Sequence, residues 1–316
     1  MKLWHWLASD GQRGQSVGNH QGLAEFIAAE AIPGPKGPIF TYSTPDMPLA
    51  RRSLIRLVER LSGRVGFERL YRDWQGARHD PAETVFTTAV RKLGVRAEVS
   101  ADEVAQIPAT GPLLVVANHP FGIVDGLLIG HLVSTRRRDV KLICHSLLCQ
   151  PPEARGILMP IDFGAGPDAR RTSAETRRRA VEWLDQGHAL IIFPAGGVAT
   201  ARAFGRHAAD FVWHPFVARL AQRAGVQTVA MFVAGQNSRL FHVVSQWSYP
   251  LRVALIFHET RRRLRAPVRV RVALPVAMAG VAKAEVVAVL RRRTYAMSEV
   301  GLKAEDTYEF PAHIRF

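Results

Sequence analysis

The feature that most constrains the fold is an apolar run, Leu113–Val116, followed at once by polar and helix-breaking residues. Four β-favouring residues in a row are typical of a strand that is buried on both faces of a sheet. The strand has to end before Pro120, because proline cannot continue a central ladder. Residues 127–133 are apolar again and predict a buried helix. His119 and Asp125 therefore lie at the carboxyl end of a strand, where ligands bind in open α/β sheets.

These two side chains define a limited chemistry. A neutral imidazole accepts a proton from a hydroxyl, and a carboxylate on its other ring nitrogen fixes the tautomer. On an uninterrupted helix His119 and Asp125 would face different sides, but Pro120 and Gly122 favour a tight turn that can bring them together. The turn contains no serine or cysteine, so a base that activates a substrate hydroxyl fits better than a covalent mechanism. A purely structural interpretation, with His119 capping the turn and Asp125 starting the helix, is equally open from this segment alone.

Composition limits the partners of the chain. It has 316 residues, 47% of them hydrophobic and 22% charged, which is typical of a globular protein with one large or two small domains. Lysine and arginine number 42 against 27 acidic residues, a net charge of +15. This excess predicts an anionic partner, which is nucleic acid, an anionic membrane surface or a phosphorylated substrate.

The pattern of apolar residues predicts a cytoplasmic protein that is soluble or peripheral. No apolar run reaches the 18 or more residues of a membrane span, and the N-terminus is too short and too polar for a secretory signal. Two cysteines, Cys144 and Cys149, lack the spacing of a metal site and fit a reducing compartment.

The order of elements predicts three parts. Residues 1–46 form an extended leader, because residues 32–38 are rich in proline and glycine. Residues 47–100 form an N-terminal helical segment, with predicted helices at Pro48–Leu61, Gly66–Trp74 and Pro81–Leu93, and a short strand at Val95–Val99. Residues 101–316 form an α/β domain, a mixed and mostly parallel sheet flanked by helices, because strands and helices alternate there.

Further boundaries within this domain follow from periodicity and turn residues. Strands are expected at Val140–Cys144, Gly156–Ile161, Ala189–Phe193 and Thr228–Val233, and an edge or half-exposed strand at Val268–Val272. Helices are expected from Ser173 to Leu184, Trp213 to Arg223, Arg252 to Arg265 (basic and amphipathic) and Val281 to Met297.

Three of the predicted strands end in turns that hold small or polar residues. These turns contain His119, Gly196–Gly197 and Asn237–Ser238. Convergence of the three strand ends would create an active-site crevice. Glycines there allow close approach of a ligand and can present N–H groups to an anion.

Three segments resemble the sequence blocks of glycerolipid (lysophospholipid) acyltransferases. Asn118–Gly126 is similar to their histidine–aspartate block, most of all to the hemolysin-like branch, which includes enzymes that make ornithine lipids by O-acylation. Phe193–Val198 resembles the third block, and Gly235–Phe241 resembles the segment that follows it. The resemblance covers roughly Pro45 to Met297.

This resemblance implies transfer of a fatty acyl group from acyl-carrier protein or acyl-CoA to the hydroxyl of a lyso-lipid. It implies that His119 is the base and Asp125 its orienting partner. Neither a metal nor a cofactor is expected. The partners are an anionic membrane surface, on the inner face of the cell membrane, and not nucleic acid. Substrate contacts are expected from Asn118, Gly122, Phe193, Pro194, Gly196, Gly197, Asn237 and Ser238.

Two positions depart from the family pattern. Ala195 stands where the third block commonly has glutamate, and Phe163 stands where the second block commonly has arginine. Both positions are associated in the family with glycerol phosphate, so we expect a different acceptor, with lyso-ornithine lipid the leading candidate. Arg170 and Arg171 can otherwise supply the missing charge.

Two other classes of function remain open from the sequence. A lipid or thioester hydrolase would use the same histidine and aspartate to activate water. A non-enzymatic binder of anionic membranes or nucleic acid would use the charge alone, although no helix-turn-helix, zinc-finger or ribonucleoprotein motif is present. Membrane binding is expected from arginine triplets and tryptophans: Arg136–Arg138, Arg177–Arg179, Arg261–Arg263, Arg291–Arg293, Trp4, Trp6 and Trp247.

Overall fold

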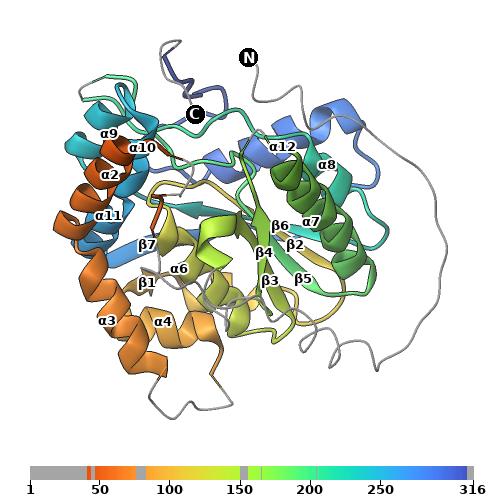
Figure 1. Ribbon diagram of the computed structural model, residues 1–316. Helices are drawn as coiled ribbons and strands as arrows, with labels where there is room; N and C mark the ends of the chain where they lie inside the picture. Colours follow the sequence, from red (N-terminus) through yellow and green to blue (C-terminus); the bar gives the residue numbers. More distant parts are fainter. Residues whose placement is uncertain are drawn as a thin grey trace. The chain divides into compact units, whose positions relative to one another are not determined.

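A mostly parallel β-sheet forms the centre of the structure, a computed structural model (Figure 1). The structure describes residues 41–43, 47–75, 83–149, 156–164, 166–203 and 205–311, all within the compact unit Pro35–Phe316. Most of the predicted leader, with Trp4 and Trp6, lies outside the described residues.

The sheet within these residues has eight strands. Seven follow the spatial order β1-β7-β6-β2-β5-β3-β4, and β8 pairs with β6. Strands β2 to β6 run parallel to one another, whereas β7 and β8 pair antiparallel with β6, and β1 pairs parallel with β7. The strands are β1 (Arg96–Glu98), β2 (Leu113–Ala117), β3 (Val140–His145), β4 (Leu158–Ile161), β5 (Ala189–Ile192), β6 (Gln227–Val233), β7 (Pro267–Val272) and β8 (Val276–Ala277).

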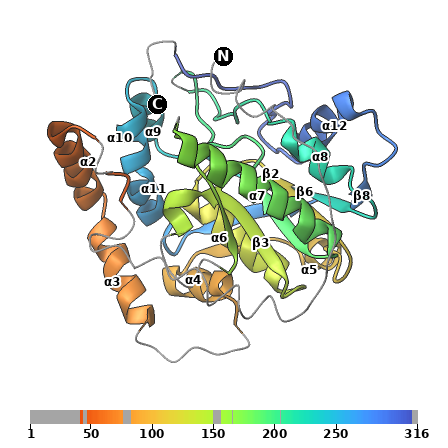
Figure 2. The same cartoon turned by 45° about the vertical axis from the view of Figure 1, so that its right-hand side comes forward.

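Helices cover both faces of the sheet (Figures 1 and 2). On one face, α4 (Val85–Leu93) and α6 (Ile123–Ser134) form a core with alternate residues of β2. On the other face, α7 (Pro167–Asp185), α8 (Phe216–Ala221) and α12 (Lys283–Tyr295) pack on the intervening residues, such as Leu114 and Val116. Every residue of β2 is buried, as expected for a central parallel strand.

A third group of helices lies beside the sheet, at the left of Figure 1. It contains α2 (Leu49–Leu61), α3 (Arg64–Gln75), α9 (Arg239–Ser245), α10 (Tyr249–Ala254) and α11 (Ile256–Arg263). Its small core of Phe241, Leu255 and Ile256 packs against Ile123 at the start of α6. These helices therefore border the end of the sheet at which β2 gives way to α6.

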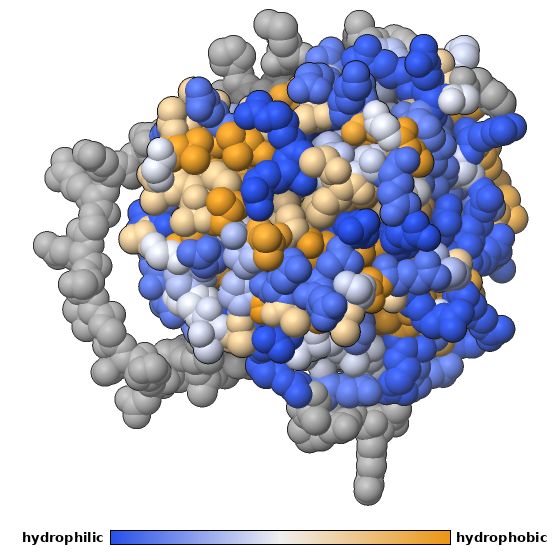
Figure 3. Space-filling model, turned by 180° about the vertical axis from the view of Figure 1, so that it is seen from behind, coloured by the Kyte–Doolittle hydropathy of each residue, from blue (hydrophilic) through white to orange (hydrophobic). Residues whose placement is uncertain are grey.

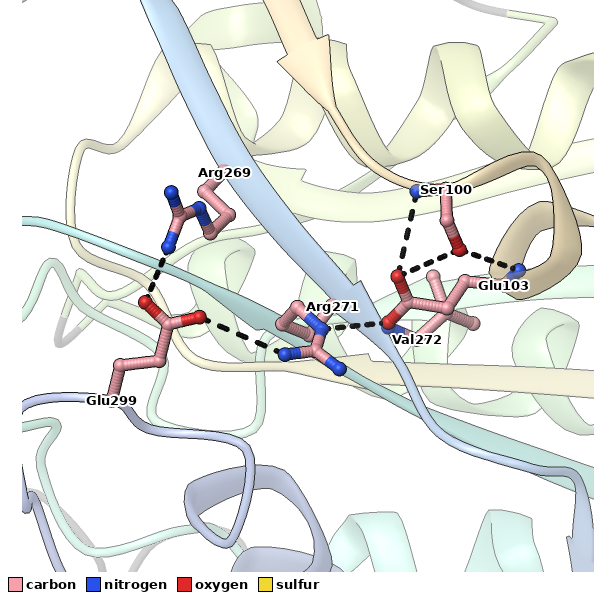
Figure 4. Close-up of polar contacts among 6 residues, drawn as sticks. All are labelled: Ser100, Glu103, Arg269, Arg271, Val272 and Glu299. Atoms are coloured by element: carbon pink, nitrogen blue, oxygen red, sulfur yellow. Dashed lines mark hydrogen bonds and ion pairs between the residues drawn. The ribbon is translucent and has the colours of Figure 1, made fainter.

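The surface of the sheet is tied to the short helix α5 (Ala101–Ala105) by a polar network (Figure 4). Ser100 and Glu103 form a capping box at the start of α5. The Glu103 carboxylate also accepts hydrogen bonds from Arg271 Nε at 2.8 Å and from the main-chain N–H of Val272 at 3.1 Å. Arg269 and Arg271 both pair with Glu299, which links β7 to the segment after α12.

The structure confirms the predicted fold class and the order of strands, with corrections at several helices. α7 begins at Pro167, not at Ser173, because Gly166–Pro167 supplies the start and the Ser173 hydroxyl instead bonds to the main chain of Asp162. α8 begins at Phe216 instead of Trp213 and ends at Ala221.

The predicted amphipathic helix from Arg252 to Arg265 is wrong in two respects. It is divided at Leu255 into α10 and α11, and Arg252 points into the protein, where it is 4% exposed. β7 is half-exposed as predicted, with alternate residues buried, but it is no edge strand because it lies between β1 and β6. In the ranges that the structure covers, no helix is long and apolar enough to cross a bilayer.

Candidate active site

His119 and Asp125 meet at the carboxyl end of β2. The Nδ1 atom of His119 lies 2.9 Å from Oδ2 of Asp125, whose side chain is fully buried. The imidazole is 16% exposed. Because Nδ1 faces the carboxylate, Nε2 is left as the ring nitrogen that can approach a substrate. This is the arrangement in which a histidine acts as a general base and a carboxylate stabilises its protonated form.

A tight turn at the start of α6 produces this contact. Asp125 is the third residue of the helix, and its Oδ2 also accepts the main-chain N–H groups of Phe121 at 2.8 Å and Gly122 at 2.9 Å. Gly122 has φ 84°, a left-handed conformation that favours glycine. A Cβ atom there would lie 3.2 Å from Val198. Gly122 therefore shapes the turn, and its predicted contact with substrate stays a prediction.

Phe193 positions the ring of His119 from the next strand. The two rings stack with centroids 4.1 Å apart and an angle of 24° between their planes. Phe193 and Pro194 are buried at the end of β5, and the turn continues through Gly196 and Gly197. The strand ends of β2 and β5 therefore converge as the sequence predicted, with the glycine turn next to His119.

The carboxyl end of β6 also lies next to the turn that carries His119. Gly235, which follows β6, has φ 113°, and a Cβ atom on it would lie 2.6 Å from the ring of Phe121. Asn118 bridges the same strands, because its side chain bonds to both main-chain polar groups of Val233. That amide therefore has a structural partner, and substrate binding by Asn118 remains a prediction.

Asn237 and Ser238 occupy the link between β6 and α9. Ser238 caps α9 by accepting the N–H of Phe241, and its own N–H and hydroxyl bond to the buried carboxylate of Glu259. Asn237 is 4% exposed. The structure thus shows Ser238 as a residue that joins α9 to α11, and the predicted contacts of both residues with substrate remain predictions.

The two positions that depart from the family pattern have different surroundings. Ala195 is buried in the core on the α7–α8 face. Phe163, by contrast, is 40% exposed and faces the glycine turn, since its ring lies 3.7 Å from where a Cβ of Gly196 would be. Its centroid is 5.5 Å from that of His145. An apolar ring therefore stands beside the turn that follows β5.

Arg170 and Arg171 lie near the start of α7. Both side chains are exposed, and Arg171 pairs with Asp168 at 3.2 Å. The structure thus places Arg171 in a surface ion pair. Its predicted part in binding an acceptor remains untested, as does that of Arg170.

Sequence reasoning missed two charged residues that contact the His119 turn. Asp210 is fully buried and accepts the main-chain N–H of His119 at 3.1 Å. Arg263 lies 4.3 Å above the ring of Phe121 and donates to the carbonyl of Gln236 at 2.9 Å. A single carboxylate in the apolar segment 208–213 was the available signal for Asp210, because an isolated charge among apolar residues is buried only with partners.

The chain was compared with protein-family models, curated proteins and solved structures. A family model described as "Acyltransferase" matches residues 74–300. Among curated proteins none matches the chain. Among solved structures the chain is similar to the 1-acyl-sn-glycerophosphate (LPA) acyltransferase PlsC from Thermotoga maritima, with 16% identity, coverage of 88% of this chain and 90% of that chain, and a TM-score of 0.41.

The family match covers more than half of the sequence and includes the whole site. The protein is therefore an enzyme of the acyltransferase class. The chain belongs to this acyltransferase family.

Proposed function

We propose that the protein is an O-acyltransferase that moves a fatty acyl group from acyl-carrier protein or acyl-CoA to the hydroxyl of a lyso-lipid. The observation that carries the proposal is the 2.9 Å contact between His119 Nδ1 and Asp125 Oδ2, with the imidazole partly exposed beside a glycine turn. This pair suits proton removal from a substrate hydroxyl. The match to the acyltransferase family supports acyl transfer as the reaction.

The reaction follows from that geometry. Nε2 of His119 takes the proton of the acceptor hydroxyl as its oxygen attacks the thioester carbonyl. The tetrahedral intermediate then collapses, the carbon–sulfur bond breaks, and the imidazolium returns its proton to the departing thiolate. The buried carboxylate of Asp125 stabilises the imidazolium between the two proton transfers. The turn that contains Gly196 and Gly197 is the candidate for holding the developing oxyanion, through main-chain N–H groups other than that of Gly196, which donates to the Phe193 carbonyl at 3.0 Å.

The acceptor is a lyso-lipid other than lysophosphatidic acid, with lyso-ornithine lipid the leading candidate. A phosphomonoester needs fixed cations, and arginine is the side chain that binds phosphate in a bidentate manner. Phe163 occupies the position of the family arginine and presents an apolar ring to the glycine turn. The chain thus belongs, in this proposal, to the hemolysin-like branch.

The enzyme reaches its acceptor as a peripheral protein on the inner face of the cell membrane. Three leucines on one side of α2, Leu54, Leu57 and Leu61, are 48–70% exposed, and the arginines Arg56 and Arg60 on the same helix are exposed too. Apolar side chains next to exposed arginines suit the interface of an anionic bilayer. On α9 and directly after it, Leu240, Val243 and Trp247 are also exposed.

The structure modifies the role of the arginine triplets. Arg137 and Arg291 are buried and bond to main-chain carbonyls, and Arg178 pairs with Glu175 and Glu182. Only part of each triplet is therefore available to a membrane. On the face seen from behind, hydrophobic residues gather mainly toward the upper left, among hydrophilic ones (Figure 3). Exposed arginines accompany the leucines of α2, and the exposed Arg239 likewise lies next to Leu240 on α9.

A comparison of acceptors tests this function. Purified protein is given acyl-carrier protein or CoA thioesters with lyso-ornithine lipid or lysophosphatidic acid, and mass spectrometry identifies the products. The proposal predicts an O-acylated lipid and a preference for lyso-ornithine lipid. Preference for lysophosphatidic acid would contradict the acceptor and point to Arg170 and Arg171. Release of free fatty acid without an acylated lipid would identify a hydrolase.

A further inference from the structure

The main chain of His119 is held on both sides by one loop. Its carbonyl accepts the N–H of Ala199 at 2.7 Å. Its N–H donates to Oδ1 of Asp210 at 3.1 Å. The residue that carries the base is therefore fixed through its peptide groups as well as through its ring.

The two ends of this loop are also bonded to each other, one residue further into the loop than Ala199 and Asp210. Thr200 and Ala209 form an antiparallel bridge, with N–H···O distances of 3.0 and 3.1 Å. The bridge places Ala199 and Asp210 next to each other, where Ala199 contacts the carbonyl of His119 and Asp210 contacts its N–H. From the α10 side, the buried guanidinium of Arg252 donates to the carbonyl of Val198 and to the Thr200 hydroxyl. The loop is thus anchored by buried polar groups.

The side chain of Asp210 is held by hydrogen bonds at both of its carboxyl oxygens. Its Oδ2 accepts the indole N–H of Trp213 at 3.0 Å, while Oδ1 accepts the N–H of His119. Burial raises the pKa of Asp210, whereas the Trp213 hydrogen bond and the charge of Arg291 act against that rise. The Tyr295 hydroxyl accepts the main-chain N–H of Asp210 at 3.2 Å. Because both carboxyl oxygens accept N–H groups, the orientation of this side chain is fixed.

We propose that Asp210 is a positioning residue for the reaction, acting through its hydrogen bond to the main chain of His119. The inference rests on the proposed function, in which His119 is the base. A shift of this peptide would move Nδ1 away from Asp125 and Nε2 away from the acceptor hydroxyl, and small displacements of a catalytic group lower rates strongly.

The first test replaces Asp210 with asparagine. The asparagine amide has one acceptor oxygen, because its nitrogen is a donor. It can therefore accept the N–H of His119 or that of Trp213, but not both. We expect kcat to fall about 10- to 100-fold while KM for donor and acceptor changes less than about threefold. Asp139→Asn is the matched control, because Asp139 pairs with Arg137 and His188 at the amino end of β3. Its activity should stay close to that of the unaltered enzyme.

A double-mutant cycle separates positioning from general damage. If Asp210 acts through His119, Asp210→Asn has no further effect on the residual activity of His119→Ala. A loss that multiplies with that of His119→Ala would overturn the proposal. So would a folded Asp210→Asn enzyme with kcat within twofold of the unaltered one.

Nuclear magnetic resonance of ¹⁵N-histidine gives a readout that needs no turnover. The ¹⁵N shifts of His119 report which ring nitrogen carries the proton. We expect a single Nδ1–H form in the unaltered protein and a mixture in Asp210→Asn. If the unaltered enzyme transfers no acyl group, the proposed function is wrong, but the tautomer of His119 can still be measured. If His119 in Asp210→Asn keeps the single Nδ1–H tautomer, the positioning role is wrong.

If Asp210→Asn does not fold, Trp213→Phe takes its place in both measurements. It keeps an aromatic ring and removes only the N–H that holds Oδ2. A three- to tenfold lower kcat with a mixed His119 tautomer would support the proposal. Unchanged kcat and an unchanged tautomer would overturn it.

Discussion

The side chain of Asn118 pairs with both main-chain polar groups of Val233, donating to the carbonyl at 2.8 Å and accepting from the N–H at 2.7 Å. It thereby joins the ends of β2 and β6 directly before His119. Asn118→Ala would leave two buried main-chain groups without partners. We expect a loss of about 2–4 kcal/mol in the free energy of unfolding, measured by urea denaturation.

A matched variant shows whether that loss is specific. Gln222→Ala removes one side-chain hydrogen bond, to the Val281 carbonyl at 2.7 Å, at the end of α8. We expect a loss of about 1 kcal/mol or less there, with full activity. A loss below about 0.5 kcal/mol for Asn118→Ala would show that the bridge to Val233 contributes little.

Gly235 should tolerate no side chain. Its φ of 113° strains any other residue, and a Cβ atom would lie 2.6 Å from the ring of Phe121. The main-chain N–H of Phe121 bonds to Asp125, so a displaced Phe121 would disturb the catalytic turn. We expect Gly235→Ala to lower both the melting temperature and kcat, with a stability loss of about 1–3 kcal/mol. Gly280→Ala is the control, because a Cβ there has no neighbour within 4 Å. Equal behaviour of the two variants would refute the steric argument.

Glu103 should stabilise the fold in a pH-dependent way. Burial raises the pKa of its carboxyl group, but hydrogen bonds from Arg271, Val272 and Ser100 together hold that pKa below the usual value. Because the folded pKa is the lower one, the stabilisation is present at neutral pH and is lost as pH falls through the folded value.

The measurement for this position is thermal unfolding between pH 3 and pH 7. Glu103→Gln should have the lower melting temperature at pH 7, by an amount equivalent to roughly 1–2 kcal/mol, and the difference should shrink towards pH 3. Glu305→Gln, at an exposed carboxylate, serves as the control. A difference that is constant over this range would mean that the charge of Glu103 has no part in it.

Membrane binding should depend on both charge and the leucines of α2. Each basic residue near an anionic leaflet contributes about 1 kcal/mol, and the attraction falls off within a Debye length. We expect co-sedimentation with anionic vesicles, weak binding to neutral ones, and release as salt rises. Replacing Leu57 and Leu61 together by serine should weaken binding further, whereas Leu274→Ser, at an exposed leucine after β7, should not. Binding that is equal for both vesicle types and insensitive to salt would contradict the role of charge.

How far the sequence predicts this site depends on the separation of the residues involved. His119 and Asp125 share one turn, so the breakers Pro120 and Gly122 allowed the sequence to suggest their approach, although a purely structural interpretation was equally open from that segment alone. Asp210 lies 91 positions from His119, and long-range contacts such as the bridge between Thr200 and Ala209 bring it there. No local pattern encodes such a contact.

The same limit applies to the charged residues. The sequence predicted a basic amphipathic helix that starts at Arg252, but the rings of Phe241 and Phe310 lie against this arginine and hydroxyl groups accept its hydrogen bonds. The buried strands, in contrast, were predicted closely. Apolar runs with turn residues at their ends leave few alternatives, whereas a lone arginine is compatible with either environment.

The most direct test of the central claim measures acyl transfer by His119→Ala next to the unaltered enzyme. Removing a general base typically lowers the rate 10²- to 10⁴-fold. Since the imidazole lies in a turn and not in the sheet core, the variant should keep its melting temperature, and Asp125→Asn should also be severely impaired. We predict a loss of at least about 100-fold in kcat for folded His119→Ala. Near-normal turnover by that folded variant would contradict the mechanism.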